Sequence, residues 1–156
     1  KVLDAVGMRY GTSHIEIMLT KDGPRLVEIG ARPHGGGHPQ FCRVATGDSQ
    51  VDRIARGFVE NGFSKLDFEL KTNLRVVFLL CRAGGQVSNR AVLDDIATLP
   101  SHHFSKINIR QGDWLKPTQD LFASLDMGFV VLAHQDAEQI VADTKMIREC
   151  EAKLFQ

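Results

Sequence analysis

The chain has 156 residues, the size of one ordinary domain or of two small lobes. Hydrophobic residues make up 43% and charged residues 24%, which is a globular composition and excludes a disordered or fibrous protein. Lysine plus arginine and aspartate plus glutamate each number 19, and this zero net charge argues against a general nucleic-acid binder. The longest apolar run, residues 76–81, is too short to span a membrane.

Cysteine usage indicates a reducing compartment. The three cysteines, Cys42, Cys81 and Cys150, are odd in number and form no Cys-x-x-Cys pair. This favours free thiols in a cytoplasmic protein over a disulfide framework or a zinc site. The chain opens without a secretion signal and begins at Lys1 within an apolar pattern, so we expect a piece of a longer protein.

The first half of the chain predicts a helix end and a β-hairpin. Residues 2–7 are typical of the last turn of a helix, with Gly7 as its C-terminal stop. Residues 14–19 alternate between apolar and polar side chains, as a half-buried strand does, and residues 25–29 form the returning strand. The glycine- and proline-rich residues 30–39 predict a loop.

A helix is expected next, with Asp48 or Ser49 as its N-cap and residues 61–62 as its end. Its apolar positions fall on one helical face: Val51, Ile54, Ala55, Phe58 and Val59.

The second half predicts shorter elements around a buried strand. In chain order they are a strand over 74–81, a helix over 91–99 stopped by Pro100, strands over 104–109 and 129–132, and a helix from Asp136. Asp136 and Gln139 resemble a capping box. We therefore predict a mixed α+β protein in two contiguous lobes, residues 1–70 and 71–156, joined near residues 63–71.

Two acidic residues, Glu16 and Glu28, lie on the two strands of the hairpin, and the loop between them decides whether they face each other. A two-residue turn at 22–23 would send their side chains to opposite faces. A three-residue loop at 21–23, with Gly23 left-handed in a β-bulge, fits the residues better and sets Glu16 opposite Glu28.

On this register His14 and Leu26 are neighbours of the acids on the same face. Like charges that face each other across a sheet are destabilising, so the pair suggests a bound cation or a shared proton. Carboxylates suit Mg²⁺ or Mn²⁺, and Mg²⁺ usually takes one or two of them together with substrate phosphates. The competing interpretation is a solvated pair on the open face of the hairpin.

A glycine-rich stretch follows the second strand. Gly35 and Gly36 can bring backbone N–H groups close to an anion, and Arg32 offers a fork that matches a carboxylate or a phosphate. A glycine run alone is weak support, but this one adjoins the acid pair. The nearby His34 and His38 are four residues apart in a loop, so they are expected to share no face, and we predict no zinc site.

The motifs Gly11-x-x-His14-x-Glu16 and, from Gly23 to Pro33, G-P-x-L-x-E-I-G-A-R-P resemble the C-terminal half of the ATP-grasp fold, an antiparallel hairpin plus a helix. They are most similar to carboxylate–amine ligases of the amino-acid ligase type, and also similar to biotin carboxylase and the glycinamide-ribonucleotide ligases. The specific motif covers only residues 11–39. Residues from about 71 onward resemble that family's small C-terminal α+β lobe.

The resemblance implies a role for each candidate residue. Glu16 and Glu28 would hold Mg²⁺ (or Mn²⁺) at the ATP phosphates, Arg32 would be catalytic, and His14, Gly35 and Gly36 would contact the nucleotide or substrate. The implied reaction passes the γ-phosphoryl group of ATP to a carboxylate, and an amine then displaces phosphate. The implied partners are small-molecule carboxylates and amines, with no nucleic acid and no membrane, and relatives often form homodimers.

One departure from the family pattern concerns Gly30, where relatives commonly have an asparagine as a further metal ligand. It favours a competing hypothesis, a non-catalytic nucleotide- or metal-binding module that keeps the fold. A third reading is a free-standing metal-binding domain. The family's adenine pocket, flap and phosphate-binding lysines would precede Lys1, so we expect a fragment that is inactive alone.

Overall fold

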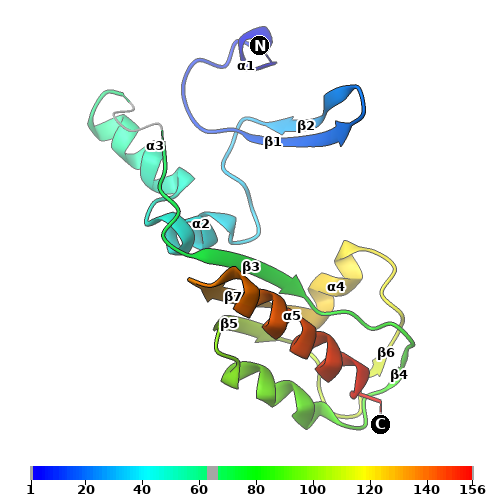
Figure 1. Cartoon of the computed structure of the whole chain (residues 1–156). Helices are drawn as coiled ribbons and strands as arrows, with labels where there is room; N and C mark the ends of the chain where they lie inside the picture. The colour runs from blue at the N-terminus through cyan, green and yellow to red at the C-terminus, as the bar shows by residue number, and fades with distance from the viewer. Residues whose placement is uncertain (1, 63–66, 156) are drawn as a thin grey trace. The chain divides into compact units, whose positions relative to one another are not determined.

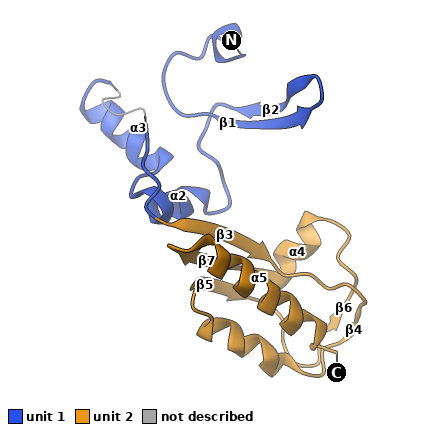
Figure 2. Cartoon of the chain, in the orientation of Figure 1, with its two compact units in different colours: residues 1–71 blue, residues 72–156 orange. Residues whose placement is uncertain are grey.

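The computed structural model describes residues 2–62 and 67–155, and the chain divides into two compact units, residues 1–71 and 72–156 (Figure 2). Part of the predicted connector, residues 63–66, lies outside the described residues. Each unit is described by itself below.

The first unit holds a two-stranded hairpin and short helices. In chain order these are α1 (Val2–Ala5), β1 (His14–Thr20), β2 (Gly23–Gly30), α2 (His38–Thr46) and α3 (Gln50–Val59) (Figure 1). The hairpin and the helix end at Gly7 are confirmed, and so is the N-cap, since the Ser49 side chain accepts a hydrogen bond from the Asp52 N–H.

Helix α2 is a correction, because the sequence predicted a loop up to residue 39 and no helix between that loop and the helix capped at Asp48 or Ser49. Pro39 lies in its first turn, and left-handed glycines flank it, Gly37 as the N-cap and Gly47 as the C-cap. Proline near a helix start and glycine just past its end are the local signals that this prediction passed over.

The apolar positions predicted to share one face of α3 are mostly exposed. Val51 is 49% exposed, Phe58 84% and Val59 86%. Periodicity shows which side chains share a face of a helix, but it does not show that another element covers that face.

The second unit is built on a three-stranded antiparallel sheet in the order β3-β7-β5, with a separate β4–β6 pair. Its elements are β3 (Asn73–Phe78), β4 (Gly85–Gln86), the 3₁₀ helix η1 (Arg90–Thr98), β5 (His102–Ile107), β6 (Trp114–Leu115), α4 (Leu121–Met127), β7 (Gly128–His134) and α5 (Ala137–Ala152). The sequence did not predict β4, β6 or α4, and it did not distinguish η1 from an α-helix.

The apolar run of residues 74–81 leaves the sheet earlier than predicted, after Phe78. Beyond it, the N–H of Leu80 donates to the carboxylate of Glu151, and the N–H of Cys81 donates to the hydroxyl of Thr118. Side chains thus accept the backbone hydrogen bonds that a neighbouring strand would otherwise accept. Burial raises the pKa of Glu151, although the Leu80 N–H and the Arg148 guanidinium act in the opposite direction.

The core of the second unit lies between the sheet and the helices η1 and α5 (Figure 1). Its most buried apolar side chains, each 1% exposed or less, include Leu79, Leu93, Ile96, Val130, Leu132 and Ile147. Burying a side chain of this size contributes about 1.5–3 kcal/mol, so these contacts dominate the stability of the unit.

Helix α5 starts at the predicted N-cap, but without the predicted capping box. The Asp136 carboxylate accepts from the Glu138 N–H, whereas the Gln139 side chain donates to Asp143 instead of reaching back. The buried carboxylate of Asp143 also accepts from both the N–H and the hydroxyl of Ser101. Asp143 thus links α5 to the residue that precedes β5.

All three cysteines are free thiols, as predicted, with Cys42 exposed and Cys81 and Cys150 buried. Across residues 2–62 and 67–155, none of the helices combines the length and the apolar character that crossing a membrane requires.

Candidate functional site

The two acids of the hairpin face each other, as the sequence predicted. Glu16 pairs directly with Glu28 in the antiparallel ladder of β1 and β2, and both side chains are exposed. Two residues away, His14 pairs with Gly30. Because side chains alternate along a strand, His14 shares the face of Glu16, so a histidine and two carboxylates lie on one side of the hairpin.

The turn that sets this register differs from the predicted one. Thr20 pairs with Gly23, so the loop contains only Lys21 and Asp22. Gly23 is left-handed, with φ of 98°, but it belongs to the first pair of the ladder. This shorter turn alone would not bring the acids opposite each other.

A β-bulge in β2, next to the Glu16–Glu28 pair, shifts the register by one residue and brings the acids opposite each other. The ladder shifts between Glu16 and Ile17, where Val27 is the extra residue. On the turn side of the bulge, Leu26 pairs with Ile17, so it lies on the face opposite the acids. The prediction that Leu26 neighbours the acids is therefore wrong, because one extra residue reverses the alternation of the strand.

The glycine loop brings three histidine rings together. His14 and His34 meet edge to face with ring centroids 4.5 Å apart, and His34 and His38 lie 3.9 Å apart. This corrects the expectation that His34 and His38 share no face. Both of their Nδ1 atoms approach the carbonyl oxygen of Gly35, at 2.8 and 3.0 Å. Since a carbonyl only accepts, both Nδ1 atoms carry the hydrogen.

The nitrogen Nδ1 of His14 is buried and has no hydrogen-bond partner in the described part of the chain. A buried polar atom of this kind is normally satisfied by protein, water or ligand. Its position beside Glu16 and the glycine loop fits a ligand group at this end of the hairpin.

The glycines themselves form a tight, exposed turn before α2. Gly36 and Gly37 are both left-handed, with φ of 65° and 81°. A Cβ atom on Gly35 would meet nothing within 4 Å, so the space beside it is open. The turn leads directly into α2, where the N–H groups of His38 and Gln40 donate to the carbonyls of Gly35 and Gly37.

In the sequence, Arg32 lies between Glu28 and Gly35, and its side chain is exposed. Its Nη1 donates to the carbonyl of Pro33 at 3.0 Å, which orients the guanidinium along the loop. One contact leaves most of its donors available.

Among residues 2–62 and 67–155, no three histidine, cysteine or acidic side chains are grouped so that they could hold a metal ion. Two facing carboxylates still fit Mg²⁺, which keeps several waters and completes its shell with substrate phosphates. The donor set therefore suits a metal that arrives with a nucleotide.

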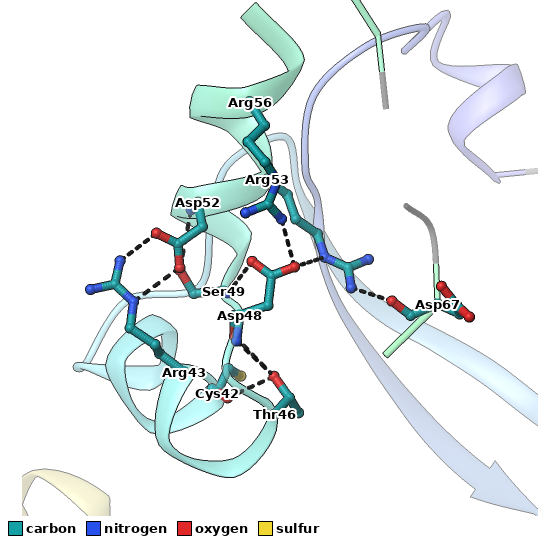
Figure 3. Close-up of polar contacts among 9 residues, drawn as sticks. All are labelled: Cys42, Arg43, Thr46, Asp48, Ser49, Asp52, Arg53, Arg56 and Asp67. Atoms are coloured by element: carbon teal, nitrogen blue, oxygen red, sulfur yellow. Dashed lines mark hydrogen bonds and ion pairs between the residues drawn. The ribbon is translucent and has the colours of Figure 1, made fainter. Parts of the chain in front are cut away.

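An ionic cluster that the sequence did not indicate joins α2 to α3 (Figure 3). The carboxylate of Asp48 accepts from Nε of Arg53 at 3.0 Å, from Nη2 of Arg56 at 2.6 Å and from the N–H of Ser49 at 2.9 Å. The hydrogen bond from Arg56 is the main reason why the pKa of Asp48 falls to about 2. Asp48 is thus ionised at neutral pH and fixes the junction between the helices.

A second pair reinforces this junction. The guanidinium of Arg43 in α2 forms two hydrogen bonds with the carboxylate of Asp52 in α3. Asp52 also accepts from the hydroxyl of Ser49 at 2.7 Å. The glycine loop ends at Gly37, the N-cap of α2. The two hydrogen bonds between Arg43 and Asp52 therefore hold the helix that follows the loop against α3.

Gln50 is the other residue that sequence reasoning missed. Its side chain accepts from the N–H of His34 and donates to the carbonyl of Ser13, which lies 37 residues away. Neither the periodicity nor a motif in the sequence indicates these contacts.

A hollow of about 420 Å³ lies elsewhere in the first unit, with Tyr10, Ile54 and Phe58 in its lining. The side chains that line it within the described residues include no carboxylate and no histidine. It does not extend the acid-pair site.

The sequence matches no family model. It is 26% identical over 166 residues to dapdiamide A synthase of Enterobacter agglomerans, covering 99% of this chain and 37% of that protein. The chain thus spans little more than a third of the curated relative that it matches.

Solved structures of ligases share the fold. The L-amino acid ligase from Bacillus licheniformis has a TM-score of 0.70 and 20% identity, covering 99% of this chain and 38% of that chain. The N5-carboxyaminoimidazole ribonucleotide synthetase from Thermotoga maritima has a TM-score of 0.58 and 20% identity, covering 96% and 38%. For the phosphoribosylglycinamide synthetase from Anaerococcus prevotii, the TM-score is 0.56 and the identity 12%, covering 94% and 37%.

The chain therefore has the fold of the C-terminal part of the ATP-grasp ligases, as the hairpin and glycine-loop motifs implied. Within that class, the amino-acid ligase matches essentially the whole chain, hairpin and small lobe together.

Proposed function

We propose that this chain is the C-terminal part of an ATP- and Mg²⁺-dependent ligase that joins a carboxylate to an amine, similar to an amino-acid ligase. The observation that carries the proposal is the facing pair Glu16 and Glu28, next to an exposed glycine loop. The ligase fold of the whole chain supports it.

In this proposal Glu16 and Glu28 hold Mg²⁺ or Mn²⁺, which supplies charge neutralisation at the ATP phosphates when bound. The metal also relieves the repulsion between two carboxylates that would otherwise face each other unpaired. Gly35 and Gly36 offer backbone N–H groups to a phosphate, and His14 offers its unpartnered Nδ1. Arg32 directs its guanidinium at the reacting carboxylate or acyl phosphate.

The reaction class is the one that the resemblance to the ligases implies, and these groups fit it. An oxygen of the substrate carboxylate attacks the γ-phosphorus of ATP and ADP leaves, and an amine then attacks the acyl carbon and phosphate leaves. Positioning and charge neutralisation are what such phosphoryl transfer requires from a protein. In this proposal the ligase is cytoplasmic and acts on small molecules, with no nucleic-acid partner. Relatives often form homodimers, and sedimentation of the full-length protein would test that assembly here.

Gly30 favours a second candidate, a module that binds nucleotide or metal without catalysis. It provides no side chain where the family pattern has asparagine, so one metal ligand is missing. Such a module would bind Mg·ATP and release no phosphate with any carboxylate.

The experiment is to measure phosphate release from Mg·ATP by the full-length protein with a panel of L-amino acids. We expect Glu28→Gln to abolish release while the protein stays folded. The matched control is Asp22→Asn, which removes an exposed acid from the turn of the same hairpin and should keep full activity.

Near-normal release by Glu28→Gln would overturn the metal assignment. Calorimetric binding of Mg·ATP by wild type without any phosphate release across the panel would favour the non-catalytic module instead.

A further inference from the structure

The side chain of Gln50 joins two backbone segments that flank the candidate site. Its Oε1 accepts from the N–H of His34 at 2.9 Å, and its Nε2 donates to the carbonyl of Ser13 at 3.1 Å. Both contacts are partly buried. Because an N–H only donates and a carbonyl only accepts, the two partners define which end of the amide faces which segment.

These segments carry the residues on which the proposed chemistry depends. Ser13 immediately precedes β1, the strand of Glu16, and His34 immediately precedes the glycines. Gln50 itself is the first residue of α3, whose start is held by the Ser49 cap. One side chain on a capped helix therefore bridges the start of the acid strand and the start of the glycine loop.

We propose that Gln50 is a positioning residue of this site: it holds the glycine loop in register with the acid pair. This inference rests on the proposed function. Gln50 acts through Ser13 and His34 and need not touch a substrate. A displacement of reacting groups by about 1 Å can lower a rate on the order of a hundredfold, so a loosened loop should be visible in kcat.

Glutamate at this position separates positioning from simple packing. A protonated carboxyl group has the shape of the amide, and it can accept from His34 and donate to Ser13. The ionised form can only accept, and it sets a negative oxygen against the Ser13 carbonyl. Gln50→Glu should therefore lose function when the carboxyl group is ionised and recover it when the group is protonated.

The test measures phosphate release by the full-length protein with Mg·ATP and the L-amino acid panel, for wild type, Gln50→Glu and Gln50→Ala, as a function of pH. We expect the kcat of Gln50→Ala to be about ten- to a hundredfold below wild type at every pH. The kcat of Gln50→Glu relative to wild type should rise as the pH falls. Dividing by wild type removes the pH dependence that the two proteins share.

The matched control is Gln86→Ala in β4, whose exposed side chain donates to the carbonyl of Gly112. It loses a comparable hydrogen bond at a residue outside the proposed site, and it should retain wild-type kcat. Melting temperatures of all variants establish that each is folded. If Gln50→Ala does not fold, the pH response of Gln50→Glu still decides.

Two outcomes would overturn the inference while leaving the proposed function intact, provided that Glu28→Gln is inactive. One is wild-type kcat in Gln50→Ala. The other is a constant ratio of Gln50→Glu to wild type across the pH range, because a packing role does not depend on the proton. Activity in Glu28→Gln would instead overturn the proposed function, and this inference with it.

Discussion

The side chain of Arg32 lies over Gly30: a Cβ atom added at residue 30 would be 3.5 Å from Cγ of Arg32 and 3.8 Å from its Cζ. These are ordinary van der Waals distances, so a methyl group would just contact the arginine. A longer side chain would compete with the guanidinium for the same space. The missing side chain at residue 30 thus leaves the room that the Arg32 side chain occupies.

On the proposed role of Arg32, we expect Gly30→Asn to lower phosphate release by the full-length protein about tenfold, because the asparagine displaces the guanidinium. Gly30→Ala should retain most of the turnover. The melting temperature should change little in either variant, since Arg32 is exposed and can move. Kinetics of phosphate release measure the effect, and a rise in turnover with asparagine would show that a metal ligand matters more here than the arginine.

Two glycines of the second unit provide a matched stability test. Both have positive φ, 112° at Gly128 and 85° at Gly112. A Cβ at Gly128 would lie 2.0 Å from the carbonyl oxygen of Lys106 in the adjacent strand, whereas a Cβ at Gly112 would meet nothing within 4 Å. We expect Gly128→Ala to cost about 3 kcal/mol or more and Gly112→Ala about 1 kcal/mol.

Urea denaturation of the two variants gives both values. Equal costs would mean that the backbone of β5 moves aside freely and that only the left-handed conformation is penalised.

The Asp48 cluster should make stability depend on pH in the acid range. Its pKa of about 2 lies below the ordinary value of 3.8, so the folded state binds the proton more weakly than the unfolded chain does. The contribution is therefore fully present above about pH 5, and it is lost as the pH falls toward 2. Asp48→Asn should be less stable than wild type at neutral pH, and the difference should shrink on acidification.

Melting temperatures between pH 2 and pH 7 check this, with Asp22→Asn as the control, which should follow wild type throughout. A difference between wild type and Asp48→Asn that stays constant from neutral to acid pH would contradict the ionic role.

The hairpin could be predicted because its information is local. Alternation in residues 14–19 identifies the strand, and the facing of Glu16 and Glu28 is confirmed by the ladder. The short turn and the bulge that produce this pairing were not predictable in the same way. The bulge at Val27 has no sequence signature, since a bulge is defined by its partner strand and by twist.

The hydrogen bonds and ion pairs that hold the site together could not be predicted from the sequence, for a different reason. The contact from Gln50 to Ser13 crosses 37 residues, and the Asp48 cluster depends on how α2 and α3 meet at Gly47. From the sequence alone, arginines and aspartates in a helix fit a solvated face as well as they fit an ionic cluster. Only the tertiary arrangement converts them into a cluster that fixes a loop.

The distribution of buried apolar side chains has a calorimetric consequence. Among the described residues, every fully buried apolar side chain belongs to the second unit, from Val77 to Leu154, whereas the first unit buries only the polar Ser49 to this degree. The heat-capacity change of unfolding follows the apolar area that becomes exposed to water. The second unit should therefore contribute most of that change and the sharper thermal transition, while the first unit melts broadly, and its backbone amides exchange with solvent deuterium first.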